Sequence, residues 1–200
     1  MKKLLKPAIL AGMLLLGSCD DETATNPTPQ NAVNYFPLTY GSTWTYELTT
    51  DGVSSTTKDS ITGDTLINGR SYVNILSYTA GTTPYSYTES YRKNGDTIFI
   101  RHENTDLITL IGRSGSMWRE TITADNYENK TTYSVVHSGV THTVEGTTYS
   151  DAIHVKKIQV ITTTGVRDTL RSDIYFAKNV GLIEQVLPSG TLRLKNYTVK

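Results

Sequence analysis

Short turn sequences that recur along the chain constrain its fold more than any other feature. Several are Asp-Gly or Asn-Gly pairs, in which glycine accepts the positive φ of a type I′ hairpin turn. Between the turns polar and apolar residues alternate, as Trp44, Tyr46 and Leu48 do with the polar residues that separate them. Turns are therefore predicted at Asp51-Gly52, Asn68-Gly69, Asn94-Gly95-Asp96, Ser138-Gly139, Gly165 and Pro188-Ser189-Gly190.

The segments between these turns are predicted to be antiparallel strands. They are 43–50, a strand ending near residue 62, 70–79, 85–93, 97–103, 131–137, 140–145, 152–164, 166–176 and 191–199. A sheet of about ten strands curls on itself or splits into two layers. The sequence therefore predicts an all-β fold, a single antiparallel meander domain forming a barrel or half-barrel (lipocalin-like or LolA-like), with a β-sandwich as the alternative. Helix is expected at most as a turn or two near Ala124–Asn129.

The N-terminus has the layout of a secretory signal peptide. Lys2, Lys3 and Lys6 precede the apolar stretch Ala8–Leu16, and the small residues of positions 17 and 18 follow it. This order of basic, apolar and small residues is typical of an export signal. The apolar stretch is shorter than the roughly 20 residues that a membrane-spanning helix needs. Residues 1–18 are therefore predicted to be a signal peptide.

The cleavage region, Leu16-Gly17-Ser18-Cys19, resembles the lipobox of bacterial lipoproteins. The resemblance implies that Cys19 becomes the first residue and carries a diacylglycerol and a further acyl chain, such as palmitate. Two or more acyl chains hold a protein firmly on a membrane. The expected location is the cell envelope, with the lipid anchor in the outer membrane. An ordinary signal peptide beside an incidental cysteine is the alternative.

The residues after Cys19 are acidic and then polar. Asp20, Asp21 and Glu22 resemble the signal that exports Bacteroidetes lipoproteins to the cell surface, although they also suit a simple solvated tether. The stretch 23–34 contains two prolines and no hydrophobic period, which is typical of an extended spacer. Residues 19–34 are thus predicted to be a lipidated tether, and residues 35–200 the all-β domain.

Charge and cysteine content exclude some classes of function. Residues 1–18 hold three lysines and no acid, so the remainder has 16 basic and 19 acidic residues, a net charge of about −3. With no basic patch, nucleic acid is not an expected partner. Cys19 is the only cysteine, so no disulfide can form within the chain. The domain must instead be stabilised by a core, and its 13 Tyr against 3 Phe favour half-exposed strands.

Three motifs together resemble a group of uncharacterised envelope lipoproteins of the Bacteroidetes type. The first, residues 35–46, resembles FPLxxGxxWxY; the second, residues 144–155, resembles VxGTFxDVxxV; the third, residues 175–183, resembles YxAxGVGLV. Asn179 stands where the group usually has glycine, and Thr148-Tyr149 spreads the middle motif. The resemblance implies a fold and a cellular location, and it implies no particular biochemical activity.

No motif for catalysis or for a cofactor is present. His137 and His142 flank the predicted Ser138-Gly139 turn, which would place both rings on one face, but Glu145 falls off that face as a third metal ligand. No metal site and no cofactor are therefore predicted. The protein is expected not to be an enzyme, although a hydrolase whose site is dispersed through the fold is an alternative.

Tyr85, Tyr87 and Tyr91 share one face of a predicted strand, interrupted only by Glu89. They form a candidate ligand-binding platform for sugar rings or an apolar molecule, with tyrosines filling a thin core as the plain alternative. Tyr72 and Tyr78, from the preceding predicted strand, are candidates to extend this platform. We expect a non-enzymatic envelope lipoprotein that binds a glycan, a lipid or a protein partner. A structural accessory subunit of a surface assembly is the alternative.

Four short runs resemble the Asp-Ser/Thr-aliphatic signal for O-glycosylation of exported Bacteroidetes proteins. Their hydroxyl residues are Ser60, Thr65, Thr97 and Thr169. The resemblance implies modification of at least one of them. Strand starts in a threonine-rich chain also generate such triplets by chance.

Overall fold

The computed structural model describes residues 34–81 and 83–200. The predicted signal peptide, the predicted anchor Cys19 and all but the last residue of the predicted tether lie outside the described residues. The described part belongs to a single compact unit. None of the described residues forms a helix long and apolar enough to cross a bilayer.

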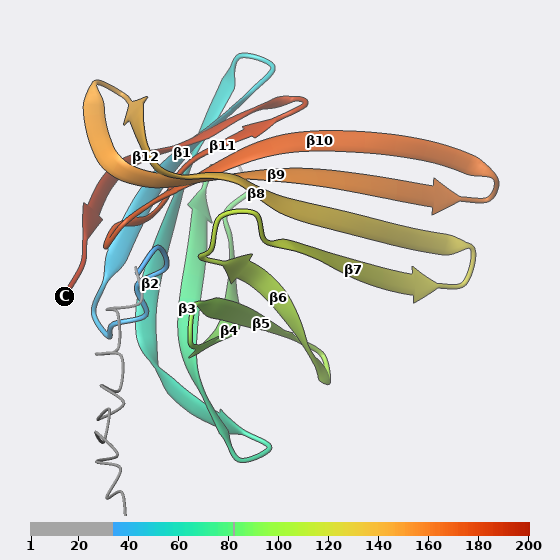
Figure 1. Cartoon of the computed structure of the whole chain (residues 1–200), viewed down its shortest axis with the longest axis horizontal. Coiled ribbons are helices and arrows are strands. Elements are labelled where there is room, and N and C mark those ends of the chain that lie inside the picture. Colours follow the sequence, from blue (N-terminus) through green and yellow to red (C-terminus); the bar gives the residue numbers. More distant parts are fainter. Residues whose placement is uncertain (1–33, 82) are drawn as a thin grey trace, which may run out of the picture. The chain divides into compact units, whose positions relative to one another are not determined.

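The described residues form one antiparallel sheet of twelve strands (Figure 1). The strands are β1 (Thr43–Thr50), β2 (Val53–Ile67), β3 (Arg70–Ala80), β4 (Tyr85–Asn94), β5 (Thr97–His102), β6 (Thr105–Ile111), β7 (Met117–Ala124), β8 (Tyr127–Val144), β9 (Thr147–Thr163), β10 (Val166–Ala177), β11 (Gly181–Leu187) and β12 (Gly190–Thr198). Their order in the sheet is β6-β5-β4-β3-β2-β1-β12-β11-β10-β9-β8-β7. Sequential strands are neighbours, and β1 pairs with β12 to join the two halves.

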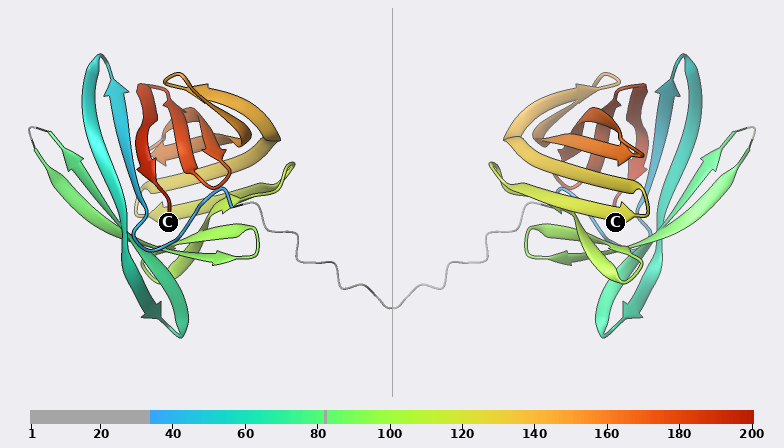
Figure 2. Two further views of the ribbon diagram at one scale, coloured as in Figure 1. Left: turned by 90° about the vertical axis from the view of Figure 1, so that its left-hand side faces the viewer. Right: turned by 90° about the vertical axis from the view of Figure 1, so that its right-hand side faces the viewer.

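The sheet curves into a nearly closed barrel, as the two side views of Figure 2 show. The predicted all-β barrel is thus confirmed, and the β-sandwich alternative was wrong because the strands stay in a single sheet. Long strands with strong twist favour closure over stacking. The ladder is not closed between β6 and β7, which are the two ends of the strand order.

Side chains span this seam between β6 and β7. Trp118 Nε1 donates a hydrogen bond of 2.7 Å to the carbonyl oxygen of Ile108. The backbone N–H of Ile108 also faces the carboxylate of Glu120 and favours its ionised form. These side chains of β7 bridge the seam without a strand ladder, and the unpaired edge that would invite other strands is partly covered.

Three of the predicted turns have the backbone expected of a type I′ hairpin, one of them Thr164-Gly165, with φ of 41° and 86°. Asp51 and Gly52 have φ of 50° and 79°, and Asn68 and Gly69 have φ of 50° and 74°. These values lie in the left-handed region, which Asn, Asp and Gly tolerate best. The sequence signal for these hairpins was therefore correct.

Two local predictions were wrong. Ser138-Gly139 is not a hairpin turn, because β8 continues through it to Val144 and the chain reverses at Glu145-Gly146. Gly139 has φ of 68° and lies among register shifts in the β8–β9 pairing, so its freedom serves β-bulges. The predicted helical turn at 124–129 is a tight β-hairpin, in which Ala124 pairs with Tyr127.

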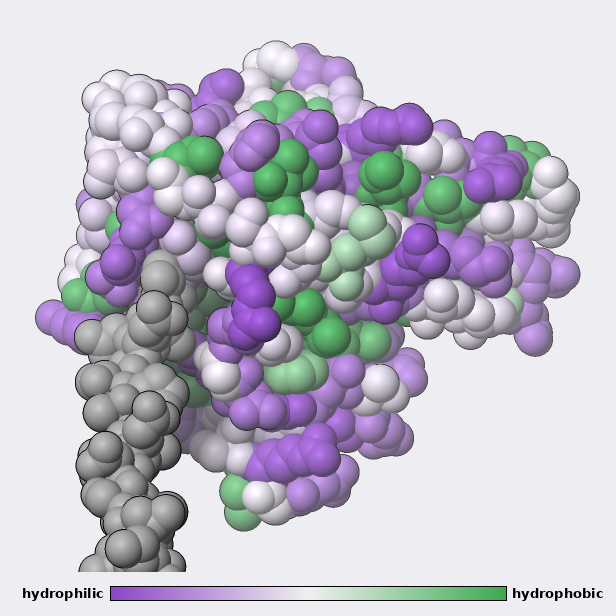
Figure 3. Space-filling view, viewed as in Figure 1, coloured by the Kyte–Doolittle hydropathy of each residue, from purple (hydrophilic) through white to green (hydrophobic). Residues whose placement is uncertain are grey.

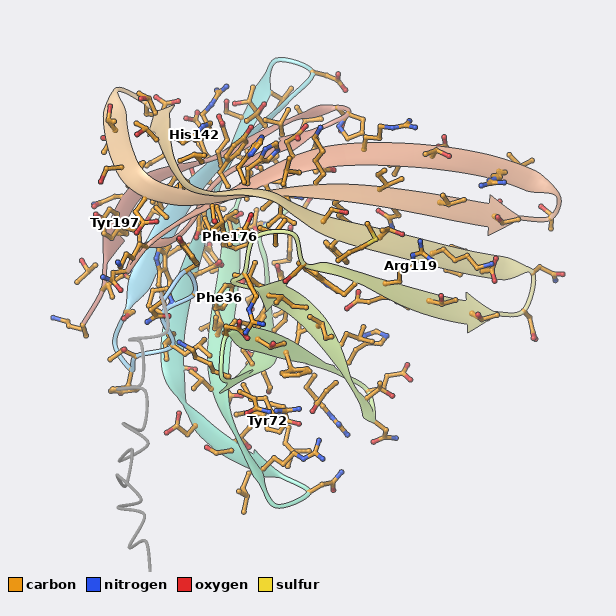
Figure 4. All side chains as sticks on the ribbon, in the orientation of Figure 1. Phe36, Tyr72, Arg119, His142, Phe176 and Tyr197 are labelled. Atoms are coloured by element: carbon orange, nitrogen blue, oxygen red, sulfur yellow. The ribbon has the colours of Figure 1, made fainter. Side chains whose placement is uncertain are left out.

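The first and third motifs meet in the core. Trp44 Nε1 donates a buried hydrogen bond of 2.6 Å to the carbonyl oxygen of Val180. A Cβ on Gly181, whose φ is 104°, would lie 3.4 Å from that nitrogen and 3.5 Å from Pro37. Phe36 also packs toward Phe176, with ring centroids 6.3 Å apart (Figure 4). Segments 136 residues apart therefore form one contact, and glycine at 181 is what lets the indole approach the backbone.

A second buried contact fixes the β3–β6 half of the sheet around Asp106 of β6. Its carboxylate accepts hydrogen bonds from Tyr72 at 2.6 Å, Arg92 at 2.8 Å and Arg101 at 3.4 Å. Burial raises the pKa of Asp106, but the three donors outweigh burial and lower it to about 2. The carboxylate therefore remains ionised and ties three other strands to β6.

Candidate functional site

The inner side of the curved sheet encloses a cavity of about 470 Å³. This volume lies within the range of small-molecule sites, 300–1,000 Å³. All strands contribute, and Phe36, which Figure 4 labels near the centre of the molecule, lies in its wall. On the face seen in Figure 3, apolar side chains gather near the middle, among polar strands.

The register of β1 to β4 builds one wall of the cavity. Because side chains alternate between the two faces of a sheet, partners two positions apart form parallel rows on one face. One row is Tyr46, Thr57, Thr79 and Tyr85; the next is Trp44, Asp59, Ser77 and Tyr87. Glu89 follows in a third row, opposite Ile75. All of these residues line the cavity, so this wall combines aromatic rings, hydroxyls and two carboxylates.

The three tyrosines predicted as a ligand platform all lie in this wall. Tyr85 and Tyr87 are about half exposed, at 56% and 47%, and their rings stack with centroids 6.2 Å apart. Tyr91 lies deeper, and its hydroxyl donates a hydrogen bond of 2.7 Å to Glu89. Ligand binding by these residues remains a prediction, but the structure brings them together at one cavity.

The two residues considered as an extension of the platform lie elsewhere. Tyr72 is fully buried and donates its hydroxyl hydrogen bond to Asp106, and Tyr78 is outside the cavity lining. They were grouped with the platform by residue type, whereas the pairing of β3 with β4 determines which residues face the cavity.

A second set of lining residues, here called the aliphatic wall, is mostly aliphatic. It is formed by Ile100 and Ile108 from β5 and β6, Ile174 and Phe176 from β10, and Leu182, Gln185 and Leu192 from β11 and β12. These residues were not predicted as site residues. Periodicity shows only that such residues are buried; which of them share a cavity depends on the closure of the sheet.

A second polar group lies near the seam. Burial raises the pKa of Glu120 and lowers the pKa of Lys157, and the charge of each opposes the shift of the other. Lys157 Nζ also lies 5.8 Å from the ring centroid of Tyr133, within cation–π distance. These two charged residues therefore partly compensate each other at this end of the cavity.

Several polar atoms of the lining have no partner. Among the described residues, buried side-chain oxygens without a hydrogen bond include Asp59 Oδ1, Thr109 Oγ1 and Glu120 Oε1, all three in the lining. A buried polar group without a partner is costly, and proteins keep few of them. Their concentration in one cavity indicates a place where a ligand or water supplies the missing partners.

The histidines do not form the arrangement considered from the sequence. His137 lies opposite His154 across β8 and β9, and His142 makes a contact of 2.8 Å with Glu184. The rings of His142 and His154 stack on Tyr175, with centroids 3.8 and 4.6 Å away. Because β8 passes straight through residues 138–139, the shared hairpin face does not exist. No group of three His, Cys, Asp or Glu in the described part of the chain is placed to hold a metal.

The four candidate glycosylation residues all lie on strands. Ser60 and Thr65 belong to β2, Thr97 begins β5, and Thr169 lies in β10. Thr169 is exposed, whereas the other three are partly buried. Thr169 is therefore the most accessible of the four, and its modification remains a prediction.

No protein-family model matches the chain, and no curated protein matches it. Two solved structures are similar in fold. One is a presumed exported protein with a YmcC-like fold from Bacteroides fragilis, at 13% identity and a TM-score of 0.58, covering 82% of this chain and 98% of the other. The second is a presumed lipoprotein from Parabacteroides distasonis, at 12% identity and a TM-score of 0.56, with the same coverage. At such identities the likeness shows that this chain has the YmcC-like fold.

Proposed function

We propose that this protein is a non-enzymatic lipoprotein of the bacterial cell envelope that binds a small amphiphilic ligand inside its barrel. The observation that carries the proposal is the cavity of about 470 Å³, lined by tyrosines and by aliphatic residues. A partly enclosed cavity with a few convergent polar groups is typical of a ligand site.

The envelope location is supported by two independent features. The N-terminal sequence has the order of a lipoprotein signal that ends at Cys19. The proteins of similar fold are described as an exported protein and a lipoprotein. A lipid anchor in the outer membrane would keep the binding domain outside the cytoplasm.

Replacing Cys19 by alanine is expected to release the protein from the membrane. Without the thiol no diacylglycerol can be attached, so the hold supplied by several acyl chains is lost. Fractionation of cells that express the full chain, followed by mass spectrometry of the N-terminal peptide, measures both effects. Ser18→Ala serves as the control and should remain in the membrane fraction. Retention of the Cys19→Ala variant there would contradict the lipid anchor.

A bulky side chain at Gln185 of β11 is expected to block the cavity. Gln185 lies in the lining, while the next residue, Val186, is 39% exposed. Adjacent strand residues point to opposite faces, so Gln185→Trp fills the cavity and Val186→Trp adds the same ring outside it. The measurement is the fluorescence of N-phenyl-1-naphthylamine with the full chain held in lipid nanodiscs.

The Val186→Trp variant should bind the probe as the wild type does, and Gln185→Trp should bind it about tenfold more weakly. Both variants carry one added tryptophan and the same lipid, so the background is matched. If all three proteins give only the signal of empty nanodiscs, the proposed binding function is wrong.

A further inference from the structure

The charges in the cavity lining are unbalanced at one end. Three carboxylates, those of Asp59, Glu89 and Glu120, face a single basic residue, Lys157. Lys157 interacts with Glu120 near the seam, on the β7–β9 side of the cavity. Asp59 and Glu89 lie on the β2–β4 wall, and the charge of Glu89 raises the pKa of Asp59. The tyrosine end of the cavity is thus negative, with no basic side chain of the lining assigned to it.

The carboxylate of Asp59 is poorly satisfied by the protein. Burial raises its pKa most, while a hydrogen bond with Ser77 acts in the opposite direction. Asp59 Oδ1 is buried and has no hydrogen-bond partner. A carboxylate taken out of water in this way needs an opposite charge nearby. At the tyrosine end of the lining the described residues supply none, and a cation in the cavity would supply it.

Aromatic residues surround the same end. Trp44 is the cross-strand neighbour of Asp59, Tyr87 lies in the same row beyond Ser77, and Tyr46 lies in the adjacent row. Tyr46 is only 5% exposed and lies in the cavity lining; burial raises the pKa of its hydroxyl most, and the nearby charge of Asp59 raises it further. Electron-rich ring faces attract cations, and a phenol hydroxyl can accept a hydrogen bond from one. The rings of Trp44, Tyr46 and Tyr87 in the lining are an observation independent of the carboxylates.

The remaining lining determines what else the ligand contains. On β10 to β12, Ile174, Leu182 and Leu192 give the lining an aliphatic surface without charge. An apolar body packed there is removed from water, which is favourable in proportion to the area buried. An anionic ligand would be repelled by the carboxylates of Asp59 and Glu89. A neutral sugar would leave the charges of these two carboxylates uncompensated.

We propose that the ligand carries a protonated amine, which lies between Asp59, Glu89 and the surrounding tyrosines, on an apolar body that packs against the aliphatic wall. This inference rests on the proposed binding function and names the chemical class of its ligand. An ammonium group has three donors, which suits Asp59, Glu89 and the Tyr46 hydroxyl.

Probes with one phenyl body and different head groups test the proposal. They are 2-phenylethylamine, 2-phenylethanol, phenylacetate and phenyl β-glucoside, titrated calorimetrically into the full chain held in lipid nanodiscs at neutral pH. Empty nanodiscs give the background. The amine is expected to bind about tenfold more tightly than the alcohol, and the carboxylate not measurably.

Two amide variants remove the charges that select the amine. Asp59→Asn and Glu89→Gln should each reduce the preference for amine over alcohol to about twofold or less. Asp51→Asn is the matched control, because Asp51 is exposed in the β1–β2 turn and asparagine also tolerates its φ of 50°. It should keep the wild-type preference. Asp59→Asn also changes the triplet Asp59-Ser60-Ile61, one of the candidate glycosylation signals, whereas Glu89→Gln leaves it intact. If both variants lose the preference for the amine, a change in glycosylation therefore cannot be the cause.

Loss of folding is separated from loss of selectivity by the melting temperature. Since burial raises the pKa of Asp59, its ionised form destabilises the free protein, and Asp59→Asn should melt no lower than the wild type at neutral pH. Equal binding of amine and alcohol by the wild type would overturn the amine inference and leave the binding function standing. Tighter binding of the glucoside would do the same, in favour of a sugar. Failure of all four probes and of the naphthylamine dye would overturn both.

Discussion

Replacing Trp44 by alanine is expected to lower the free energy of unfolding by about 4 kcal/mol. The indole is 5% exposed and packs where the first and third motifs meet. The substitution removes its packing and leaves the carbonyl oxygen of Val180 without its 2.6 Å hydrogen bond. Chemical denaturation followed by far-ultraviolet circular dichroism measures the loss.

Trp44→Phe separates the two contributions. The phenyl ring keeps much of the packing but cannot donate a hydrogen bond, so a smaller loss of about 1–3 kcal/mol is expected. The matched control is Tyr40→Ala, since that aromatic ring is 70% exposed and its removal should change stability little. A loss below about 1 kcal/mol for Trp44→Ala would mean that this contact does not hold the two ends of the domain together.

Replacing Asp106 by alanine is expected to destabilise the protein by about 3–5 kcal/mol at neutral pH. The substitution leaves Arg92 and Arg101, whose side chains are only 17% and 11% exposed, without their common carboxylate. It also removes the acceptor of the Tyr72 hydroxyl. The control is Asp96→Ala, which breaks an ion pair with Arg113 that is largely exposed and should cost less than about 1 kcal/mol.

The effect of Asp106 should depend on pH in a defined direction. Its pKa is lowered in the folded state from 3.8 to about 2. A lowered pKa means that the contribution is fully present above 3.8 and is lost as the pH falls toward 2. Melting temperatures of the wild type and Asp106→Ala should therefore converge as the pH falls through that interval. A constant difference across the interval would show that the arginine contacts act through packing and not through charge.

The sequence predicted the hairpins best where turn chemistry was strongest. Asp51-Gly52 and Asn68-Gly69 form the turns expected of them, because few residues other than Gly, Asn and Asp adopt the required backbone. Ser138-Gly139 misled the prediction because glycine serves bulges as well as turns. Strands β6, β7 and β11 were not among the predicted strands, although each is seven or eight residues long.

The candidate site was only half visible from the sequence. Tyr85, Tyr87 and Tyr91 could be grouped because they alternate along one strand, and all three line the cavity. Asp59 gave no comparable signal, since an acid in a polar strand normally faces solvent. Its position inside follows from its cross-strand partners Trp44 and Ser77, and such pairing is a property of the assembled sheet. Glu120 and Lys157 become neighbours for the same reason.

The seam between β6 and β7 has a consequence for how the barrel can move. Elsewhere, parting two strands breaks a whole ladder of backbone hydrogen bonds, whereas between β6 and β7 the side chains of Trp118 and Glu120 meet the backbone of one residue, Ile108. Breaking these two contacts would open the sheet along its length and leave every hairpin intact. A ligand of the proposed kind would then enter from the side without unfolding of the domain, past Glu120, whose carboxylate lines the cavity.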